Sequence, residues 1–224
     1  MENYFFRYSF EDNQTRQYEI LVAGKIVVVS PVGSFQNPVG IKLAISQKIL
    51  SVEEEHALIA VTIEKVETNV EIPSDQLPEP GKRSIMRMNK LGQVFWVEGI
   101  AAWQGAEYSM MRFPSGPLRP GEYWDQQVEE ANGTASPFFT RYIFNGLNKK
   151  NRRLAEFRTE LYTGHPDSSE SILAGEGRFL FSLDECWIMS CENRIEYKFS
   201  MPFPENPAQK IITHTCLNIE MERV

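Results

Sequence analysis

Apolar and polar side chains alternate with a period of two over much of this sequence, and no other feature restricts the fold as strongly. Runs of this kind occur at residues 4–10, 41–46, 59–64 and 217–222. The clearest run has Ile195, Tyr197, Phe199 and Met201 alternating with Arg194, Glu196, Lys198 and Ser200. Because successive side chains of a strand point to opposite faces, the pattern predicts strands with one buried and one solvated face. Such strands are typical of antiparallel sheets.

Turn signals separate these runs at hairpin distances. Gly92, the stretch 148–151 and the pair Asp184–Glu185 each lie between two strand-like segments. The alternation rule gives roughly ten to twelve strands. Only residues 100–112 resemble a helix, and Pro114, Pro117 and Pro120 end it. We therefore predict an all-β fold, a large, curved, half-barrel-like antiparallel sheet with one short helical crossover.

Two pairs of segments suggest an internal duplication. Residues 57–66 resemble 152–161, and residues 85–97 resemble 178–190, at a similar offset. We expect a single β domain over residues 1–224, built from two similar halves, 1–113 and 114–224. A continuous sheet and two separate domains would look the same in sequence.

Composition excludes several classes of protein. The 224 residues are 42% apolar, 12% aromatic and 24% charged, which excludes a disordered chain. The formal net charge of −7 argues against a nucleic-acid surface. No apolar stretch reaches the roughly 18 residues of a membrane-spanning helix. The N-terminal residues do not form a secretory signal, so we expect a cytoplasmic protein, the alternative being an exported one whose leader is absent from this sequence.

Candidate chemical groups are dispersed. His56 and His165 have no partner at a recognisable spacing, whereas His214 and Cys216 share a strand face. Buried cysteines are more common than a zinc site built on this pair, so we predict no metal and no cofactor. We also predict no enzymatic activity. The alternative is a dispersed active site that uses His165 or Asp167, or His214.

One basic cluster, residues 149–153, could contact phosphate or an anionic membrane surface. In an acidic chain it is better interpreted as a solvated hairpin tip.

Aromatic and methionine side chains fill the predicted apolar face. Such side chains supply large and adaptable contact area, so part of this face could hold an apolar ligand. The predicted ligand-lining residues are Met88, Trp96, Trp124, Phe157, Phe179, Phe181, Trp187, Met189, Tyr197 and Phe199. The alternative is an ordinary filled core without a ligand.

The segment 113–124, Phe-Pro-Ser-Gly-Pro-Leu-Arg-Pro-Gly-Glu-Tyr-Trp, resembles a phrase that joins the two halves of a group of uncharacterised bacterial proteins. That group is similar to the lipoprotein-carrier fold, and in it an aspartate stands where this chain has Glu122. The strand 85–89 before Gly92 also fits, as does the order of the segments 139–162 and 175–190. The resemblance implies a curved antiparallel half-barrel, closed by short helices, that binds acyl chains. The sequence departs from the group in lacking a signal peptide and an N-terminal cysteine that could carry a lipid.

The sequence thus predicts a non-catalytic binding protein that holds a lipid or another hydrophobic molecule on the concave face of its sheet. Contact with a membrane surface stays open, and a protein partner is not specified. The alternative is a structural or protein-interaction module with a filled core.

Overall fold

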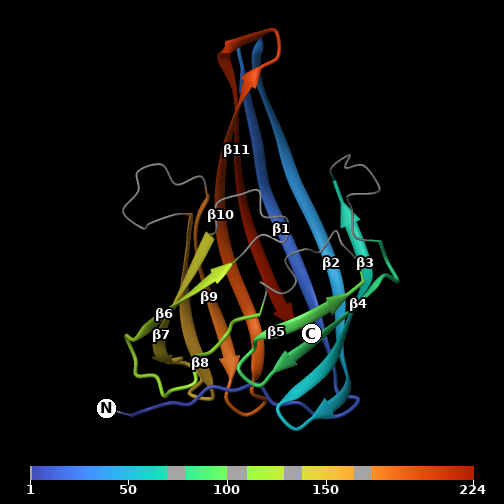
Figure 1. Cartoon of the computed structure of the whole chain (residues 1–224), viewed down its shortest axis with the longest axis vertical. Coiled ribbons are helices and arrows are strands. Elements are labelled where there is room, and N and C mark those ends of the chain that lie inside the picture. Colours follow the sequence, from blue (N-terminus) through green and yellow to red (C-terminus); the bar gives the residue numbers. More distant parts are fainter. Residues whose placement is uncertain (1, 70–78, 100–109, 129–137, 164–172) are drawn as a thin grey trace.

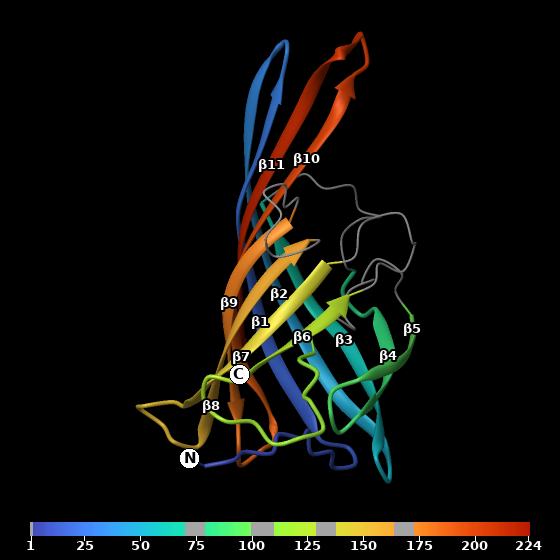
Figure 2. The same ribbon diagram turned by 60° about the vertical axis from the view of Figure 1, so that its left-hand side comes forward.

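The computed structural model describes residues 2–69, 79–99, 110–128, 138–163 and 173–224. The strands in these ranges are β1 (Thr15–Ser30), β2 (Gly33–Glu53), β3 (His56–Thr68), β4 (Arg83–Asn89), β5 (Val94–Glu98), β6 (Tyr123–Val128), β7 (Phe138–Leu147), β8 (Leu154–Thr163), β9 (Leu173–Ser182), β10 (Trp187–Phe203) and β11 (Asn206–Arg223). All of them belong to one curved, open antiparallel sheet, as Figures 1 and 2 show. The all-β, half-barrel-like prediction is confirmed.

The strand order shows how the chain builds this sheet. It is β5-β4-β3-β2-β1-β11-β10-β9-β8-β7-β6, so each half of the chain forms a meander. The two meanders join where β1 pairs with β11, from Tyr18 opposite Arg223 to Val29 opposite Ile212. The segments that resemble each other in sequence are β3 and β8, and the hairpins β4–β5 and β9–β10. The duplication and the domain assignment stay predictions.

The predicted turns lie between strands. Gly92 connects β4 and β5, the stretch 148–151 connects β7 and β8, and Asp184–Glu185 connects β9 and β10. Gly92 has φ +86°, and a Cβ there would lie 2.4 Å from the carbonyl oxygen of Met111. This turn therefore needs a glycine both for its backbone conformation and for its close packing.

One face of the sheet, here called the inner face, carries the core. Cross-strand partners share a face, and the buried side chains of Tyr18, Ile45 and Ile63 are such partners on β1, β2 and β3. The same face continues through Cys191 on β10, Phe179 on β9 and other buried residues. The opposite, outer face carries most of the charged residues of these strands.

Two segments outside the sheet lie across the lower part of the inner face. The first comprises residues 2–14, with Phe6 and Tyr8 buried, and the second comprises residues 110–118, with Met111, Phe113 and Leu118 buried. They contact each other through a β-bridge between Tyr4 and Leu118 and through the rings of Phe6 and Tyr8, which pack against Phe113. The predicted alternation at residues 4–10 is therefore real, but this extended segment packs on the sheet instead of joining it as a strand.

The predicted helical crossover at 100–112 falls almost entirely outside the described residues. The described part, Met110 to Arg112, has no helical conformation. No helix occurs in the described ranges, and so none in them is long and apolar enough to cross a membrane.

β1, β2, β10 and β11 are longer than their neighbours and extend beyond the rest of the sheet as two hairpins (Figure 1). Their tips lie at the end of the molecule opposite the N-terminal segment. The inner face is thus divided into a covered lower part and an upper part carried by long strands.

Candidate functional site: the inner face of the sheet

The lower inner face is a packed aromatic core. Of the predicted ligand-lining residues, five are buried there: Met88, Phe157, Phe179, Phe181 and Trp187. The ring of Phe6 lies edge-on to Phe157 at 5.1 Å and to Phe181 at 6.0 Å, between centroids. The ring of Tyr8 lies 5.0 Å from that of Trp187. These five side chains are covered by the chain's own residues, and a ligand role for them stays untested.

Two buried hydroxyl groups secure this core. The Tyr8 hydroxyl donates a hydrogen bond to the carbonyl oxygen of Met111 at 2.9 Å, and the Tyr18 hydroxyl donates to that of Ile188 at 3.0 Å. Burial raises the pKa of both phenols well above the usual value, because it penalises the charged phenolate. Both groups therefore act as neutral structural donors, and neither is suited to acid–base catalysis at neutral pH.

A buried cation completes the lower end. The guanidinium of Arg16 lies 3.8 Å from the centroid of the Trp187 ring and donates to Gln14. Its burial lowers its pKa, although at a guanidinium the charge is retained at any ordinary pH. Stacking on the indole compensates part of the desolvation cost of this charge.

Four of the other predicted residues lie in three different environments. Trp124 is half-buried, stacks on Tyr142 with centroids 5.2 Å apart and donates to the carbonyl oxygen of Arg112 at 2.7 Å. Met189 is half-buried, with its sulfur 3.6 Å from Nη1 of Arg223. Tyr197 and Phe199 are 40% and 42% exposed, on the upper inner face. Trp96 lies on β5 opposite Arg87, and its side chain is outside the described part of the structure.

The upper inner face is an apolar surface on the four long strands. Its cross-strand rows are Ile41, Val22, Ile219 and Asn193, then Val39, Gly24, Leu217 and Ile195, then Asn37, Ile26, Thr215 and Tyr197. The residues in these rows are half-buried apart from the exposed Asn37 and Tyr197. This surface can bind apolar groups by contact alone, since it offers shape and burial but no reactive group.

A polar pair borders this surface. The Thr159 hydroxyl donates to the amide oxygen of Asn193 at 3.3 Å, across Gly177 on the strand between them. A Cβ at Gly177 would lie 2.0 Å from that amide oxygen, so glycine makes room for the pair. The Thr159–Asn193 pair places a hydroxyl and an amide beside the apolar rows, where a polar ligand group could be hydrogen-bonded.

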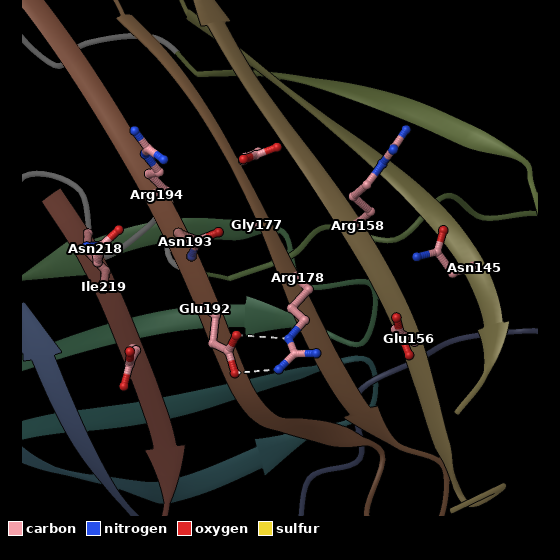
Figure 3. Close-up of a pocket in the computed structure, with 12 residues that line it drawn as sticks. Asn145, Glu156, Arg158, Gly177, Arg178, Glu192, Asn193, Arg194, Asn218 and Ile219 are labelled. Carbon is pink, nitrogen blue, oxygen red and sulfur yellow. Dashed lines mark hydrogen bonds and ion pairs between the residues drawn. The ribbon is translucent and has the colours of Figure 1, made fainter. Parts of the chain in front are cut away.

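The outer face is coated with ion pairs. A depression of about 450 Å³ lies on this face across β7 to β11 and is shallow and open. Figure 3 shows the two hydrogen bonds, 2.7 and 3.0 Å, between Arg178 and the carboxylate of Glu192 that lie in it. Arg158 pairs with Glu160, and Arg194 pairs with Glu196, at 2.9 and 2.8 Å. Because these cations already have carboxylate partners, the depression is a solvated ionic surface and a poor apolar site.

The candidate chemical groups that the structure describes do not converge. His214 is partly exposed on β11 with Nε2 3.9 Å from Glu196, and His56 lies at the start of β3, beside the ring of Phe95. His165 and Asp167 lie outside the described ranges. Within those ranges, no three His, Cys, Asp or Glu residues come together as metal ligands.

The aliphatic residues of the upper inner face were missing from the residues predicted from the sequence. Val22, Ile26, Ile195, Leu217 and Ile219 carry it, whereas the prediction favoured aromatic and methionine residues. The alternation at 217–221 contained this signal. It showed which residues share a face, but not that this stretch of the face lies above the covering segments.

Comparison with known proteins gives a fold and no family. No family model matches the sequence, and no curated protein is detectably similar to it. Among solved structures, a lipovitellin, determined to describe lipid–protein interactions, is similar with a TM-score of 0.53 and 10% sequence identity. The match covers 96% of this chain and 25% of lipovitellin, so the chain spans about a quarter of that relative.

Two bacterial structures are also similar. One is a DUF1329 family protein from Desulfovibrio piger, with TM-score 0.26, 9% identity and coverage of 94% of this chain and 85% of that one. The other is a putative outer membrane lipoprotein-sorting protein domain from Vibrio parahaemolyticus, with TM-score 0.22, 8% identity and coverage of 92% and 83%. They are the kinds of protein that the sequence resemblance named. Their superposition is too loose to support an argument, and the shared fold rests on the match to lipovitellin.

Proposed function

We propose that this protein is a non-catalytic carrier or binding protein that holds a lipid-like molecule on the upper inner face of its sheet. The observation that supports it is the largely apolar surface on β2, β1, β11 and β10, which the two covering segments do not fill. The similarity to lipovitellin, whose structure concerns lipid–protein interactions, agrees with this proposal. Nothing in the described residues supports a reaction.

The chemistry of the surface suggests what kind of ligand would fit. Aliphatic rows favour an extended hydrocarbon chain, and the Thr159–Asn193 pair at the border suits a polar head or ester group. Burying one aliphatic side chain against a ligand contributes about 1.5–3 kcal/mol, so a few contacts suffice for micromolar binding after the cost of association.

The test is uptake of a fluorescent fatty-acid probe by protein purified without detergent, with native mass spectrometry for any molecule already bound. Val22→Asp adds a charge to the inner face, and we expect it to weaken probe binding by about tenfold or more. Leu21→Asp is the matched control, because Leu21 is the adjacent residue on β1 but lies 44% exposed on the outer face. Tyr197→Glu repeats the inner-face test at a more exposed position, where folding is less affected.

The alternative is a protein-interaction module. The filled aromatic core at the lower end supports this alternative. An apo mass together with no probe uptake by the natural protein would overturn the carrier proposal and favour this alternative. Equal probe affinities of Val22→Asp, Tyr197→Glu and Leu21→Asp would show that any probe binds elsewhere.

A further inference from the structure

Exposed apolar side chains gather at one end of the molecule, on the tips of the hairpins β1–β2 and β10–β11. Val32 is 72% exposed and Phe35 60% exposed, both on the first hairpin. Val29, Phe199, Met201 and Ile212 are 42–46% exposed. A cluster of exposed apolar side chains on a solvated surface indicates a site that contacts another molecule or a membrane.

These side chains occur on both faces of the hairpins and at the turn. On the inner face, Val28 is opposite Phe35 on β2 and Thr213 on β11, and Thr213 is opposite Phe199 on β10. On the outer face, Val29 is opposite Ile212. Val32 lies in the turn between Ser30 and Gly33. A protein that docked on one face would leave the other apolar face in water, whereas a medium that surrounds the tips would cover both.

The same end is almost free of charge. No charged residue occurs between Lys25 and Lys42, and only Glu205 and Lys210 occur from Phe199 to Thr213, in a chain that is 24% charged. Inserting β1–β2 into a low-dielectric medium therefore desolvates no charge. With no excess of cations, the tips have no preference for an anionic surface.

We propose that the two hairpin tips insert into the interfacial region of a lipid bilayer and dock the protein end-on on a membrane. The occupant that fits this end is a neutral, zwitterionic phospholipid surface, because the first tip carries no charge and the second carries one charge of each sign, on Glu205 and Lys210. Lys25 and Lys198, at the base of the tips, stay in the aqueous headgroup layer. This proposal does not require a ligand on the inner face. If both hold, docking places the open end of the apolar rows at the lipid surface.

The test is flotation of the protein of residues 1–224 with phosphatidylcholine vesicles, compared with vesicles that also contain phosphatidylglycerol. The natural protein is expected to bind both, with no gain from the anionic lipid. Val32→Asp and Phe35→Asp are each expected to reduce the bound fraction about tenfold or more. Phe5→Asp is the matched control, because Phe5 is 66% exposed and belongs to the N-terminal segment, which lies at the opposite end of the molecule (Figure 1). Val32→Trp adds a local probe, whose fluorescence is expected to shift to the blue and to be quenched by brominated lipid.

Three outcomes would overturn the proposal. The first is flotation that requires phosphatidylglycerol and is lost in Lys149→Glu/Lys150→Glu, which would assign docking to the basic turn. The second is an oligomer, seen by light scattering, that Val32→Asp dissociates while flotation is absent, which would assign the tips to a second copy. The third is Val32→Trp fluorescence that vesicles leave unchanged. Uptake of the fatty-acid probe should survive Val32→Asp, so this proposal and the carrier proposal can fail independently.

Discussion

At the scale of single residues, Tyr18 connects the strands on either side of β11. Its side chain starts on β1, and its hydroxyl donates to the carbonyl oxygen of Ile188 on β10. The hydrogen bond contributes about 0.5–1.5 kcal/mol, and it also satisfies a polar group that burial would otherwise penalise. The same burial makes this residue sensitive to alkaline pH.

Tyr18 is expected to contribute to a loss of stability above pH 10, together with Tyr8, whose pKa burial also raises. The folded-state pKa of Tyr18 is raised by burial, whereas in the unfolded chain the phenol ionises near pH 10. The stabilisation is complete below the unfolded pKa and is lost as pH rises toward the folded pKa, by up to about 1.4 kcal/mol per pH unit. Urea unfolding between pH 8 and 11 measures it. The free energy of unfolding of Tyr18→Phe should fall less steeply with pH than that of the natural protein. The free energy of unfolding of Tyr123→Phe, a change at a 60% exposed position, should fall as steeply as that of the natural protein. Identical slopes for all three proteins would contradict the assignment.

At the scale of elements, the N-terminal segment acts as a structural cover. It makes backbone hydrogen bonds to other segments along its length, among them Tyr8 N–H to the carbonyl of Lys90 at 2.7 Å and Ser9 N–H to that of Cys186 at 3.2 Å. It also buries Phe6 and Tyr8, which are 4% and 1% exposed. Side-chain burial therefore contributes to how firmly this segment closes the lower inner face.

Two neighbouring residues of this segment are expected to differ sharply in their effect on stability. Phe6→Ala opens a cavity among Phe113, Phe144, Phe157 and Phe181, and should lower the free energy of unfolding by about 3–5 kcal/mol. Phe5→Ala alters an exposed side chain and should change it by about 0.5 kcal/mol or less. Chemical denaturation compares them. A small loss in Phe6→Ala would mean that the segment is not firmly packed on the sheet.

At the scale of the whole molecule, the two halves form one sheet through the pairing of β1 with β11. Gly24 lies in this joint opposite Leu217, and a Cβ there would lie 2.0 Å from the carbonyl oxygen of Cys216. The backbones of β1 and β11 approach each other at this point in a way that only glycine permits without a shift.

Gly24→Val is therefore expected to weaken the joint between the halves. Forcing a side chain into this contact costs about 1–3 kcal/mol, and thermal unfolding should occur at a lower temperature. Gly116→Ala is the control, because a Cβ at Gly116 meets no atom within 4 Å and should leave the transition temperature nearly unchanged. An unchanged transition in Gly24→Val would show that the joint adapts without cost.

Much of this architecture could be predicted from the sequence. The runs at 41–45, 59–63, 195–201 and 217–221 are strands, and the three predicted turns connect strands. These features are local, because alternation and turn residues act over a few positions of the chain. The same locality explains the error at residues 4–10, where an extended segment alternates equally well whether or not it pairs in a sheet.

The alternating sequence determined by itself that this chain forms an antiparallel sheet with one apolar face. Only the tertiary structure decided which part of that face is covered, since Phe157, Phe181 and Trp187 are buried by Phe6, Tyr8 and Phe113 from distant segments. It also decided that Val22, Ile219 and Tyr197 lie above this cover. The physical reason is that a residue's face depends on its immediate neighbours, whereas its exposure depends on contacts between segments that are far apart in the chain.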